Sequence, residues 1–445
     1  MNQRQIEPAS QAGLAARSTA IAVLAQVLDR HIPLDDAFAT AVTENLPGKT
    51  ASRDRAFARA LVTTALRRLG QIDDALSRFM EKPLPRKAGP TRHILRLGLA
   101  EILFLDTKPH ATVHCAVALA AQDSMARHYK ALVNAVLRRA TQTKTEIVAP
   151  QDAPRLNTPD WLWDGWCTAY DQAIVRAIAQ VHLTEPCLDL TVADPNKRQE
   201  WADKLEAVIL PTGTLRRRLG GLVDELPGFA EGAWWVQDAA AALPATFLGD
   251  VRDRTIIDLC AAPGGKTAQL AAAGAHVIAI DRSKARHAVM RQNIDRLGLE
   301  VQLILDDAAT WQAPELASHV LLDAPCTATG TIRRHPDLPY LKKPQDVAAL
   351  ARQQKRLLGH AAELLAPGGL LVFCTCSLDP AEGPDIITTF LDQHKAYERL
   401  PLTPQDVSGC AEFITHDGDL RTLPCHWPDS GGLDGFYAAR LVRVH

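Results

Sequence analysis

The 445-residue sequence predicts a multidomain protein, in which an all-helical bundle precedes an α/β domain and a small α+β insert lies between them. Two patterns carry this prediction. Apolar residues recur at helical spacing over residues 14–139, and short aliphatic strands alternate with helical segments from Trp234 onward. The length excludes a single small module, because one hydrophobic core stops growing at roughly 250–300 residues.

The composition is that of an ordinary globular protein in water. Hydrophobic residues make up 47% of the chain and charged residues 22%, and no run of about eighteen apolar residues occurs. The start, MNQRQIEPAS, lacks the features of a secretory signal, so we expect a cytoplasmic protein. The nine cysteines are scattered and form no CxxC pair, which argues against a disulfide framework and against a structural metal site.

Residues 1–142 are predicted to form the helical bundle. Segments such as AIAVLAQVL, FARALVTTALRRL and ALVNAVLRRA repeat apolar positions at helical spacing and contain few β-branched runs. Over residues 141–155 this periodicity disappears, while polar residues and prolines increase. We therefore predict a linker at 143–155.

The bundle is basic although the whole chain carries a net charge of −2. Residues 1–142 hold 20 Lys and Arg against 12 Asp and Glu, and residues 51–100 hold eleven against four. The eleven are Arg53, Arg55, Arg59, Arg67, Arg68, Arg78, Lys82, Arg86, Lys87, Arg92 and Arg96. This density suits contact with the phosphates of a nucleic acid, but a solvated helical surface has the same composition.

Residues 156–228 are predicted as the small α+β insert and residues 229–445 as the α/β domain. The insert combines a helical piece around Trp161, Trp163 and Trp166 with the candidate strands LDLTV and AVIL. The α/β domain contains the strands TIIDLC, HVIAID, VQLILD, HVLLDAP and GLLVFCTC. Strands that alternate with helices form a Rossmann-like parallel sheet covered on both faces, and ligands bind at its carboxyl edge.

The first strand of this sheet is followed by a loop of small residues, Cys260, Ala261, Ala262, Pro263, Gly264, Gly265 and Lys266. Such a loop lets a ligand approach the backbone and face the start of the next helix. The loop matches neither the dinucleotide fingerprint GxGxxG nor the phosphate loop GxxxxGK, which disfavours NAD and ATP. The next strand ends in Asp281, at a distance that suits an acidic side chain accepting hydrogen bonds from ribose hydroxyls, and a third strand ends in Asp306-Asp307. Each Asp could instead be a turn residue or a helix cap.

Two cysteines follow the last two of the predicted strands. Cys326 comes shortly after Asp323, and Cys376 follows the strand that contains Cys374. Because consecutive strands near the centre of such a sheet are usually neighbours, we expect Cys326 and Cys376 to meet at one rim beside Asp323. Cys374 should instead be an inert cysteine inside the strand. A cationic group follows Cys326: Arg333, Arg334 and His335.

Three motifs in this order resemble one enzyme family. DLCAAPGGKT, DAPCTATGTIRRHPD and the TCS of FCTCSLDP are similar to motifs of the NOL/NOP/Sun family of RNA cytosine-5 methyltransferases, and VQDAAAALP and DGFYAARL resemble its flanking elements. The basic bundle resembles the NusB-like RNA-binding domain. The combination resembles the bacterial branch of the family, which methylates one cytosine of 16S ribosomal RNA.

The resemblance implies a chemistry. Carbon 5 of cytosine is a poor nucleophile, so a thiolate adds to carbon 6 and creates an enamine whose carbon 5 can attack a sulfonium methyl group. By resemblance Cys376 is the attacking thiol, and Cys326 assists release of the methylated product. The spacing alone leaves these two roles open. Asp323 would stabilise the adduct, through the cytosine or through the amino group of the cofactor.

The implied cofactor is S-adenosylmethionine. By resemblance the loop from Cys260 to Lys266 wraps it, Asp281 binds its ribose, and Asp307 binds its adenine amino group, with Asp306 as the alternative. Arg333, Arg334 and His335 would hold phosphates that flank the target, or would form a surface salt-bridge cluster instead. The implied partner is ribosomal RNA, bound through an unstacked cytosine in a single-stranded or loop region, by a monomer without membrane contact.

The chain departs from the family pattern in two places. After TCS the family commonly continues Pro-Glu-Glu-Asn, whereas this chain retains only the second acid, as Glu382. An expected Arg-x-Asn is replaced by TVA at 191–193, which leaves the RNA contacts of the insert unassigned.

Three other functions remain open from the sequence. Transfer RNA or another ribosomal cytosine could be the substrate. The chain could be a non-catalytic RNA-binding assembly factor, which intact Cys326 and Cys376 disfavour. A thiol redox or metal protein using Cys374 and Cys376 is disfavoured by the lack of further Cys/His pairs at ligand spacing.

Overall fold

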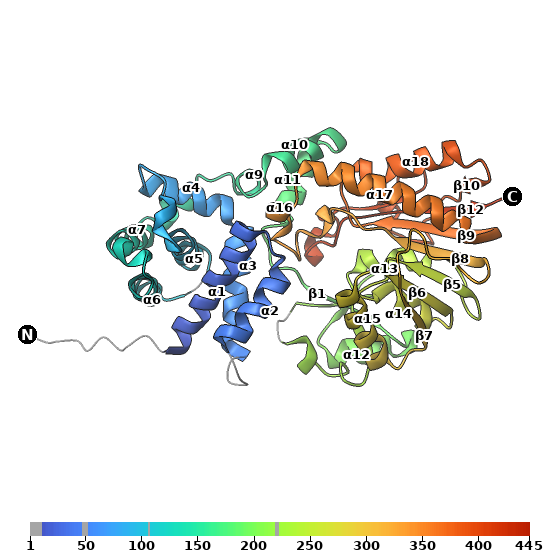
Figure 1. Cartoon of the computed structure of the whole chain (residues 1–445), viewed down its shortest axis with the longest axis horizontal. Coiled ribbons are helices and arrows are strands. Elements are labelled where there is room, and N and C mark those ends of the chain that lie inside the picture. Colours follow the sequence, from blue (N-terminus) through green and yellow to red (C-terminus); the bar gives the residue numbers. More distant parts are fainter. Residues whose placement is uncertain (1–10, 47–51, 106, 219–221) are drawn as a thin grey trace, which may run out of the picture. The chain divides into compact units, whose positions relative to one another are not determined.

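A computed structural model describes residues 11–46, 52–105, 107–218 and 222–445 of the chain (Figure 1). The described residues form two compact units. The first comprises the described residues up to Cys167, together with Val175–Leu183 and His335–Lys343, and the second comprises Thr168–Ile174, the described residues of 184–334, and Pro344–His445. None of the helices in the described part of the chain has the length and apolarity needed to cross a membrane.

The first unit is helical, as predicted. Its bundle consists of α1 (Gln11–Arg30), α2 (Leu34–Asn45), α3 (Ser52–Arg67), α4 (Leu69–Phe79), α5 (Thr91–Phe104), α6 (Pro109–Gln122) and α7 (Lys130–Gln142). Helix α5 is buried on nearly all sides, which a sequence as apolar as ILRLGLAEILF allows. Its one buried acid, Glu101, is satisfied by Arg17 at 2.9 Å and by the Thr112 hydroxyl at 2.9 Å.

The predicted linker is in fact part of this unit. Residues 143–155 contain α8 (Lys144–Val148) and the start of α9 (Ala153–Leu156), and Ile147 is buried in the core of the bundle. Gln151 also donates a hydrogen bond to the backbone carbonyl of Gln71 at 2.9 Å. A segment of 13 residues with a few apolar positions shows no periodicity, so its packing could not be read from the pattern.

A second difference concerns residues 335–343, which the sequence places in the α/β domain. These residues, with the short helix α16 (Leu338–Leu341), belong to the helical unit. The Asp337 carboxylate accepts a hydrogen bond from the Leu34 backbone N–H at 2.9 Å, and the Tyr340 hydroxyl donates to the Leu66 carbonyl at 3.0 Å. The α/β domain predicted at 229–445 is therefore interrupted by a segment that belongs to the helical unit.

The second unit contains two sheets, and the smaller corresponds to the predicted insert. It has the order β2-β3-β1-β4, with β1 (Leu188–Val192), β2 (Val208–Ile209), β3 (Leu215–Arg217) and β4 (Trp234–Val236). In the sequence α12 (Arg198–Lys204) lies between β1 and β2. The helical piece around Trp161, Trp163 and Trp166, which was predicted as part of the insert, belongs instead to the first unit, as does most of the two helices there, α10 (Asp160–Ala169) and α11 (Gln172–Val181). The strands LDLTV and AVIL are confirmed, but the predicted end of the insert at 228 excludes β4, which pairs with β1.

The larger sheet is eight-stranded, with the path β10-β12-β9-β8-β5-β6-β7 and β11 paired to β12. All five predicted strands are present, and they pair in parallel. The strands are β5 (Thr255–Leu259), β6 (His276–Asp281), β7 (Val301–Leu305), β8 (Ala317–Asp323), β9 (Leu365–Thr375), β10 (Tyr397–Arg399), β11 (Leu420–Thr422) and β12 (Phe436–Arg443). The antiparallel strand β12 was not predicted, so the sheet is mixed rather than purely parallel.

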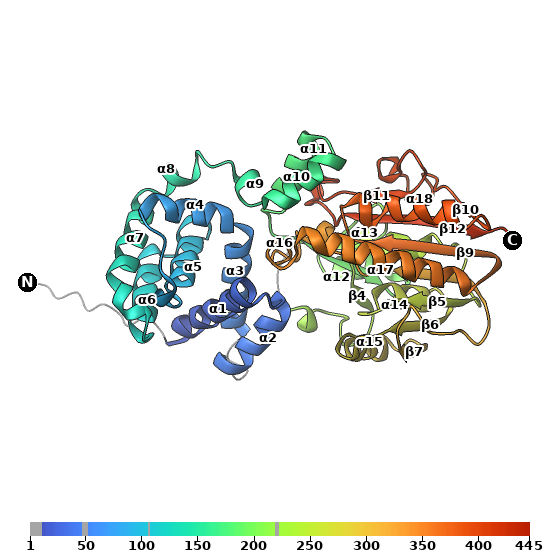
Figure 2. The ribbon, with the colours of Figure 1, turned by 45° about the horizontal axis from the view of Figure 1, so that its top comes forward.

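Helices cover both faces of the larger sheet, as predicted. One apolar cluster joins the sheet to α13 (Ala239–Thr246), α14 (Gly265–Ala272) and α15 (Lys284–Leu297). A second cluster joins the opposite face to α17 (Pro344–Glu363) and α18 (Pro384–Gln393), which lie together along the sheet in Figure 2. Because the parallel strands run the same way, their carboxyl ends share one edge, and the loops that follow them meet there.

Candidate active site

Cys326 and Cys376 lie side by side at the carboxyl edge of the larger sheet. Strands β8 and β9 are parallel neighbours, with Asp323 opposite Cys374 in register. The loops that follow them bring the Cys326 and Cys376 Sγ atoms to 3.4 Å from each other. The expectation that the two thiols meet beside Asp323 is therefore confirmed.

Of the three cysteines at this edge, Cys374 is buried, whereas Cys326 and Cys376 are partly exposed. The hydrogen bond with Cys376 and burial raise the pKa of the Cys326 thiol well above its usual range, so Cys326 keeps its proton at neutral pH. Burial also raises the pKa of Cys374, which is fully buried inside β9. Cys376 is half-buried and hence accessible to a substrate, which agrees with the prediction that Cys374 is the inert residue.

A buried carboxylate holds the loop that carries Cys326. Glu382 accepts hydrogen bonds from the Thr327 backbone N–H at 3.0 Å, from the Thr327 hydroxyl, and from the Gln354 side-chain amide at 3.2 Å. Glu382 is 0% exposed, and burial raises its pKa despite these hydrogen bonds. Glu382, the family acid that the sequence retains, is thus held by hydrogen bonds to Thr327, the residue next to Cys326.

The loop beyond Cys326 approaches the backbone of its neighbours closely. The Gly330 N–H donates to the Cys376 carbonyl at 2.9 Å, and the Gly330 carbonyl accepts from the Gly435 N–H at 2.8 Å. A Cβ atom at position 330 would lie 2.1 Å from the Gly435 oxygen, so only glycine fits. These contacts tie the two cysteine loops to each other.

Lys266 and Asp323 form an ion pair beside the thiols. The Lys266 Nζ donates to Asp323 Oδ2 at 2.7 Å and lies 4.8 Å from the centre of the Phe436 ring. Burial lowers the pKa of Lys266, but the Asp323 carboxylate outweighs it and raises the pKa above the usual value. Lys266 is therefore a fixed cation, and about a third of the Asp323 side chain remains exposed to the edge of the sheet.

The glycine loop connects β5 to α14 as predicted. Gly264 has a φ of 98°, which L side chains rarely adopt, and a Cβ there would lie 2.9 Å from Met290 Cγ. The Ala262 N–H donates to Asp281 Oδ2 at 3.2 Å, so the loop lies against the end of β6. Below it, burial raises the pKa of Asp258 to about 7, although the Thr267 hydroxyl donates to this carboxylate at 2.6 Å.

These residues fit S-adenosylmethionine. No side chain caps the start of α14, so its backbone N–H groups face the loop and can bind a carboxylate. Each carboxylate oxygen of Asp281 accepts one backbone hydrogen bond, one from the Ala262 N–H and the other from the Ser283 N–H at 2.9 Å. Each oxygen therefore has a further lone pair that can accept a hydrogen bond from a ribose hydroxyl.

The structure does not choose between Asp306 and Asp307. Asp306 accepts a hydrogen bond from the Asp307 N–H at 2.7 Å, and Asp307 accepts one from the Ala309 N–H at 3.0 Å. Both side chains thus stabilise the turn after β7. Asp307 as the adenine ligand stays a prediction.

The prediction that Arg333 contacts RNA phosphates is wrong. Its side chain is 0% exposed, and Nη2 lies 2.6 Å from Asp238 Oδ2 and 3.4 Å from Asp434 Oδ1. Arg334 is one-third exposed, and its Nε donates to Asp434 Oδ2 at 2.8 Å. His335 belongs to the helical unit. The cationic run is thus largely an internal ion-pair cluster, which differs from the surface salt-bridge cluster that the sequence offered as the alternative.

Asp238, Asp434 and Glu382 support the site but were not predicted as site residues. Asp238 also accepts hydrogen bonds from the Ala240 and Asp434 backbone N–H groups, at 2.9 and 3.0 Å. Burial raises the pKa of Asp238 to about 6. Asp238 lies in the motif VQDAAAALP and Asp434 in the motif DGFYAARL, so the sequence did mark both acids. It did not show that they share Arg333 as a partner.

The fold and the site together define a class, the S-adenosylmethionine-dependent methyltransferases. The family model described as 16S rRNA methyltransferase RsmB/F matches residues 245–442, and the NusB family model matches residues 14–142. The chain is 33% identical to the ribosomal RNA small subunit methyltransferase B of Vibrio cholerae, over 96% of this chain and 98% of the relative. The chain belongs to this family of RNA methyltransferases.

Two further comparisons agree with that assignment. The protein of the same name from Sodalis glossinidius is 33% identical, over 96% of this chain and 97% of the relative. The crystal structure of PH0851 has the same fold, with a TM-score of 0.75 and 23% identity over 96% of this chain and 98% of that chain.

Proposed function

We propose that this enzyme methylates carbon 5 of one cytosine in 16S ribosomal RNA through a covalent bond between Cys376 and carbon 6. The observation that carries the proposal is the 3.4 Å separation of the Cys326 and Cys376 sulfur atoms at the carboxyl edge of the sheet. Two adjacent thiols there supply one group to add to the pyrimidine and a second to act during release. The names of the relatives support ribosomal RNA of the small subunit as the substrate.

Cys376 forms the covalent bond. Its sulfur, as the thiolate, adds to carbon 6, and the electrons of the C5=C6 double bond move to carbon 5, which becomes nucleophilic. S-adenosylmethionine supplies the methyl group that carbon 5 takes. Loss of the carbon 5 proton to a base restores the double bond and expels the Cys376 thiolate. The accessible position of Cys376 just beyond β9 supports this role over that of buried Cys374.

The neighbouring groups act on the substrate and on the leaving sulfur. Cys326 holds a proton beside the Cys376 sulfur, which suits assistance in the release of the methylated product. Asp323 offers its exposed carboxylate to the cytosine or to the cofactor's amino group, while Lys266 fixes its orientation. The site thereby presents a preorganised charge, which costs no rearrangement in the transition state.

The target cytosine must leave its stack to reach this edge, so we propose a single-stranded or loop nucleotide of ribosomal RNA. The proposed form of the enzyme is a monomer. A ribosomal RNA substrate implies work in the cytoplasm.

Mapping of 5-methylcytosine tests the proposed function. Ribosomal RNA from cells without the protein should lack one 5-methylcytosine of 16S RNA, and the wild-type gene should restore it. Cys376→Ala should fail to restore it, although the purified variant still binds the RNA. A 16S map that is unchanged by removal of the gene would refute the substrate, and a mark that Cys376→Ala restores would refute the nucleophile.

A further inference from the structure

Three of the eleven basic residues of 51–100 that could contact RNA pair with aspartates of the bundle. Among residues 51–100, Arg59 pairs with Asp35 at 2.6 Å, and Arg96 pairs with Asp73 at 2.6 Å. Arg78 likewise pairs with an aspartate of its own helix. Charges neutralised in this way contribute little to phosphate binding. The basic density of this stretch therefore does not identify the RNA-binding surface of the bundle.

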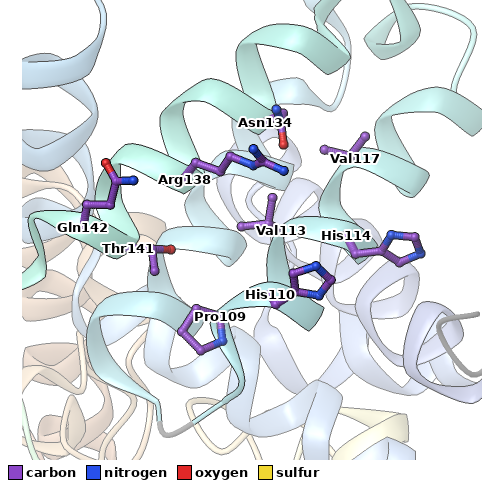
Figure 3. A pocket seen from close by; sticks show the side chains of 9 residues that line it. All are labelled: Pro109, His110, Val113, His114, Val117, Asn134, Arg138, Thr141 and Gln142. Carbon is purple, nitrogen blue, oxygen red and sulfur yellow. The ribbon is translucent and has the colours of Figure 1, made fainter. Parts of the chain in front are cut away.

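A groove between α6 and α7 has a different character. It encloses about 450 Å³, which lies within the range of ligand sites in proteins. Val113 and Val117 of α6 provide its apolar part, and Figure 3 shows Asn134 and Arg138 of α7 across from His110 and His114 of α6. On each helix the two polar residues are four positions apart, so they share one face.

The Thr141 hydroxyl donates to the Leu137 carbonyl, but four other polar side chains of the groove are not engaged by the described part of the protein. Among the described residues, no hydrogen bond or ion pair involves the side chains of His110, His114, Asn134 or Arg138, in contrast to the paired arginines of α3 to α5. The adjacent Arg139 lies over the Phe79 ring instead. The donors and acceptors of these four side chains are thus available to a ligand.

The groove and its surroundings favour an anion. No Asp or Glu lines it. From residue 107 to residue 145 the chain carries six Lys and Arg and a single acid, Asp123. The Asp123 side chain accepts backbone hydrogen bonds from Met125 and Ala126, at 2.9 and 2.8 Å. A polyanion is therefore attracted to this segment of the bundle.

We propose that the α6–α7 groove binds a nucleotide of single-stranded RNA, in a segment of the substrate other than the target cytosine. The base lies on Val113 and Val117 with its edge toward Asn134, whose amide both donates and accepts. Arg138 contacts the phosphate, and the two imidazoles of α6 contact base or backbone, as histidines do in RNA complexes. The identity of the RNA as this enzyme's substrate rests on the proposed function.

Charge reversal at the groove tests this inference in the full-length protein. The affinity for in vitro transcribed 16S RNA is measured by filter binding at several salt concentrations, for wild type, Arg138→Glu and the matched control Arg53→Glu. Arg53 is also exposed and lies on α3 of the same unit. Arg138→Glu should weaken binding by about tenfold or more and reduce the salt slope by about one, whereas Arg53→Glu should change affinity less than about twofold.

A second variant separates base contact from charge. Asn134→Leu preserves the charge of the groove, so it should weaken binding without altering the salt slope. Photocrosslinking of the wild type to RNA containing 4-thiouridine should give crosslinked peptides within residues 109–142. Equal losses in Arg138→Glu and Arg53→Glu, or crosslinks that lie elsewhere only, would overturn the inference.

Two other outcomes have a distinct meaning. Wild-type protein that neither binds nor methylates 16S RNA would refute the proposed function rather than the groove. Arg138→Glu protein that binds and methylates naked RNA normally, but fails on assembling small subunits, would show that the groove binds a protein, and the inference would be wrong.

Discussion

Replacement of Arg333 by Met should destabilise the second unit by about 3–5 kcal/mol, because it removes one partner of a buried ion pair. The Arg333 side chain is completely buried between two carboxylates, those of Asp238 and Asp434, which are 1% and 0% exposed. Methionine fills much of the volume but leaves both negative charges without their shared cation. Burial already raises the pKa of Asp238 to about 6 in the presence of Arg333.

Urea unfolding of the full-length protein, followed by tryptophan fluorescence, measures this loss. Arg334→Met is the matched control. Arg334 is one-third exposed and pairs with Asp434, so its loss should cost about 1–2 kcal/mol. A raised carboxylate pKa means that stability is gained as the pH falls below that pKa, so the Arg333→Met defect should shrink between pH 7 and pH 5.

The reasoning on Arg333 is refuted by one combination of results. If Arg333→Met unfolds at the wild-type urea concentration but has lost affinity for RNA, the guanidinium contacts phosphates and is not a structural cation. Equal losses of stability in Arg333→Met and Arg334→Met would contradict the argument from burial.

Two further predictions concern buried carboxylates near the site. Glu382→Gln should lower kcat by about tenfold and leave the Kd for RNA unchanged, because an amide cannot accept both hydrogen bonds of Thr327 as the carboxylate does. Single-turnover kinetics measure the change in rate. An unchanged kcat would contradict the role of Glu382 in positioning the Cys326 loop. Asp258 has a pKa of about 7, so its ionisation costs the wild type stability as the pH rises toward 7. Asp258→Asn should therefore gain stability relative to wild type between pH 5 and pH 8 in urea titrations, and a constant difference would show that Asp258 is already ionised at pH 5.

Much of the larger sheet and the meeting of the thiols follow from the sequence. The five parallel strands are short aliphatic runs, and their loops carry Gly264, Asp281 and Asp323 where a parallel sheet binds its ligands. The adjacency of β8 and β9 brings Cys326 and Cys376 together, as the order of the strands predicts. These inferences succeed because each depends on local patterns and on one topological rule.

Other features depend on contacts that no local pattern contains. Strands β10 and β11 have only three residues each, too few to show alternation, and the sheet gains its antiparallel edge through them and β12. Arg333 lies 95 and 101 residues from its two carboxylate partners in the sequence. Its charge therefore suggested a solvent-exposed side chain, although the side chain is buried between these partners. The contact of Tyr340 could not be read from the sequence either, because its hydrogen-bond partner Leu66 is 274 residues away.

The most direct test of the covalent mechanism is a denaturing gel of Cys326→Ala protein incubated with 16S RNA and S-adenosylmethionine. If Cys376 adds to carbon 6 and Cys326 assists release, the variant accumulates a protein–RNA adduct that survives denaturation. The adduct should be absent from the Cys326→Ala, Cys376→Ala double variant. An adduct that persists in the double variant, or Cys326→Ala protein that turns over at the wild-type rate without any adduct, would contradict the assigned roles of the two sulfur atoms.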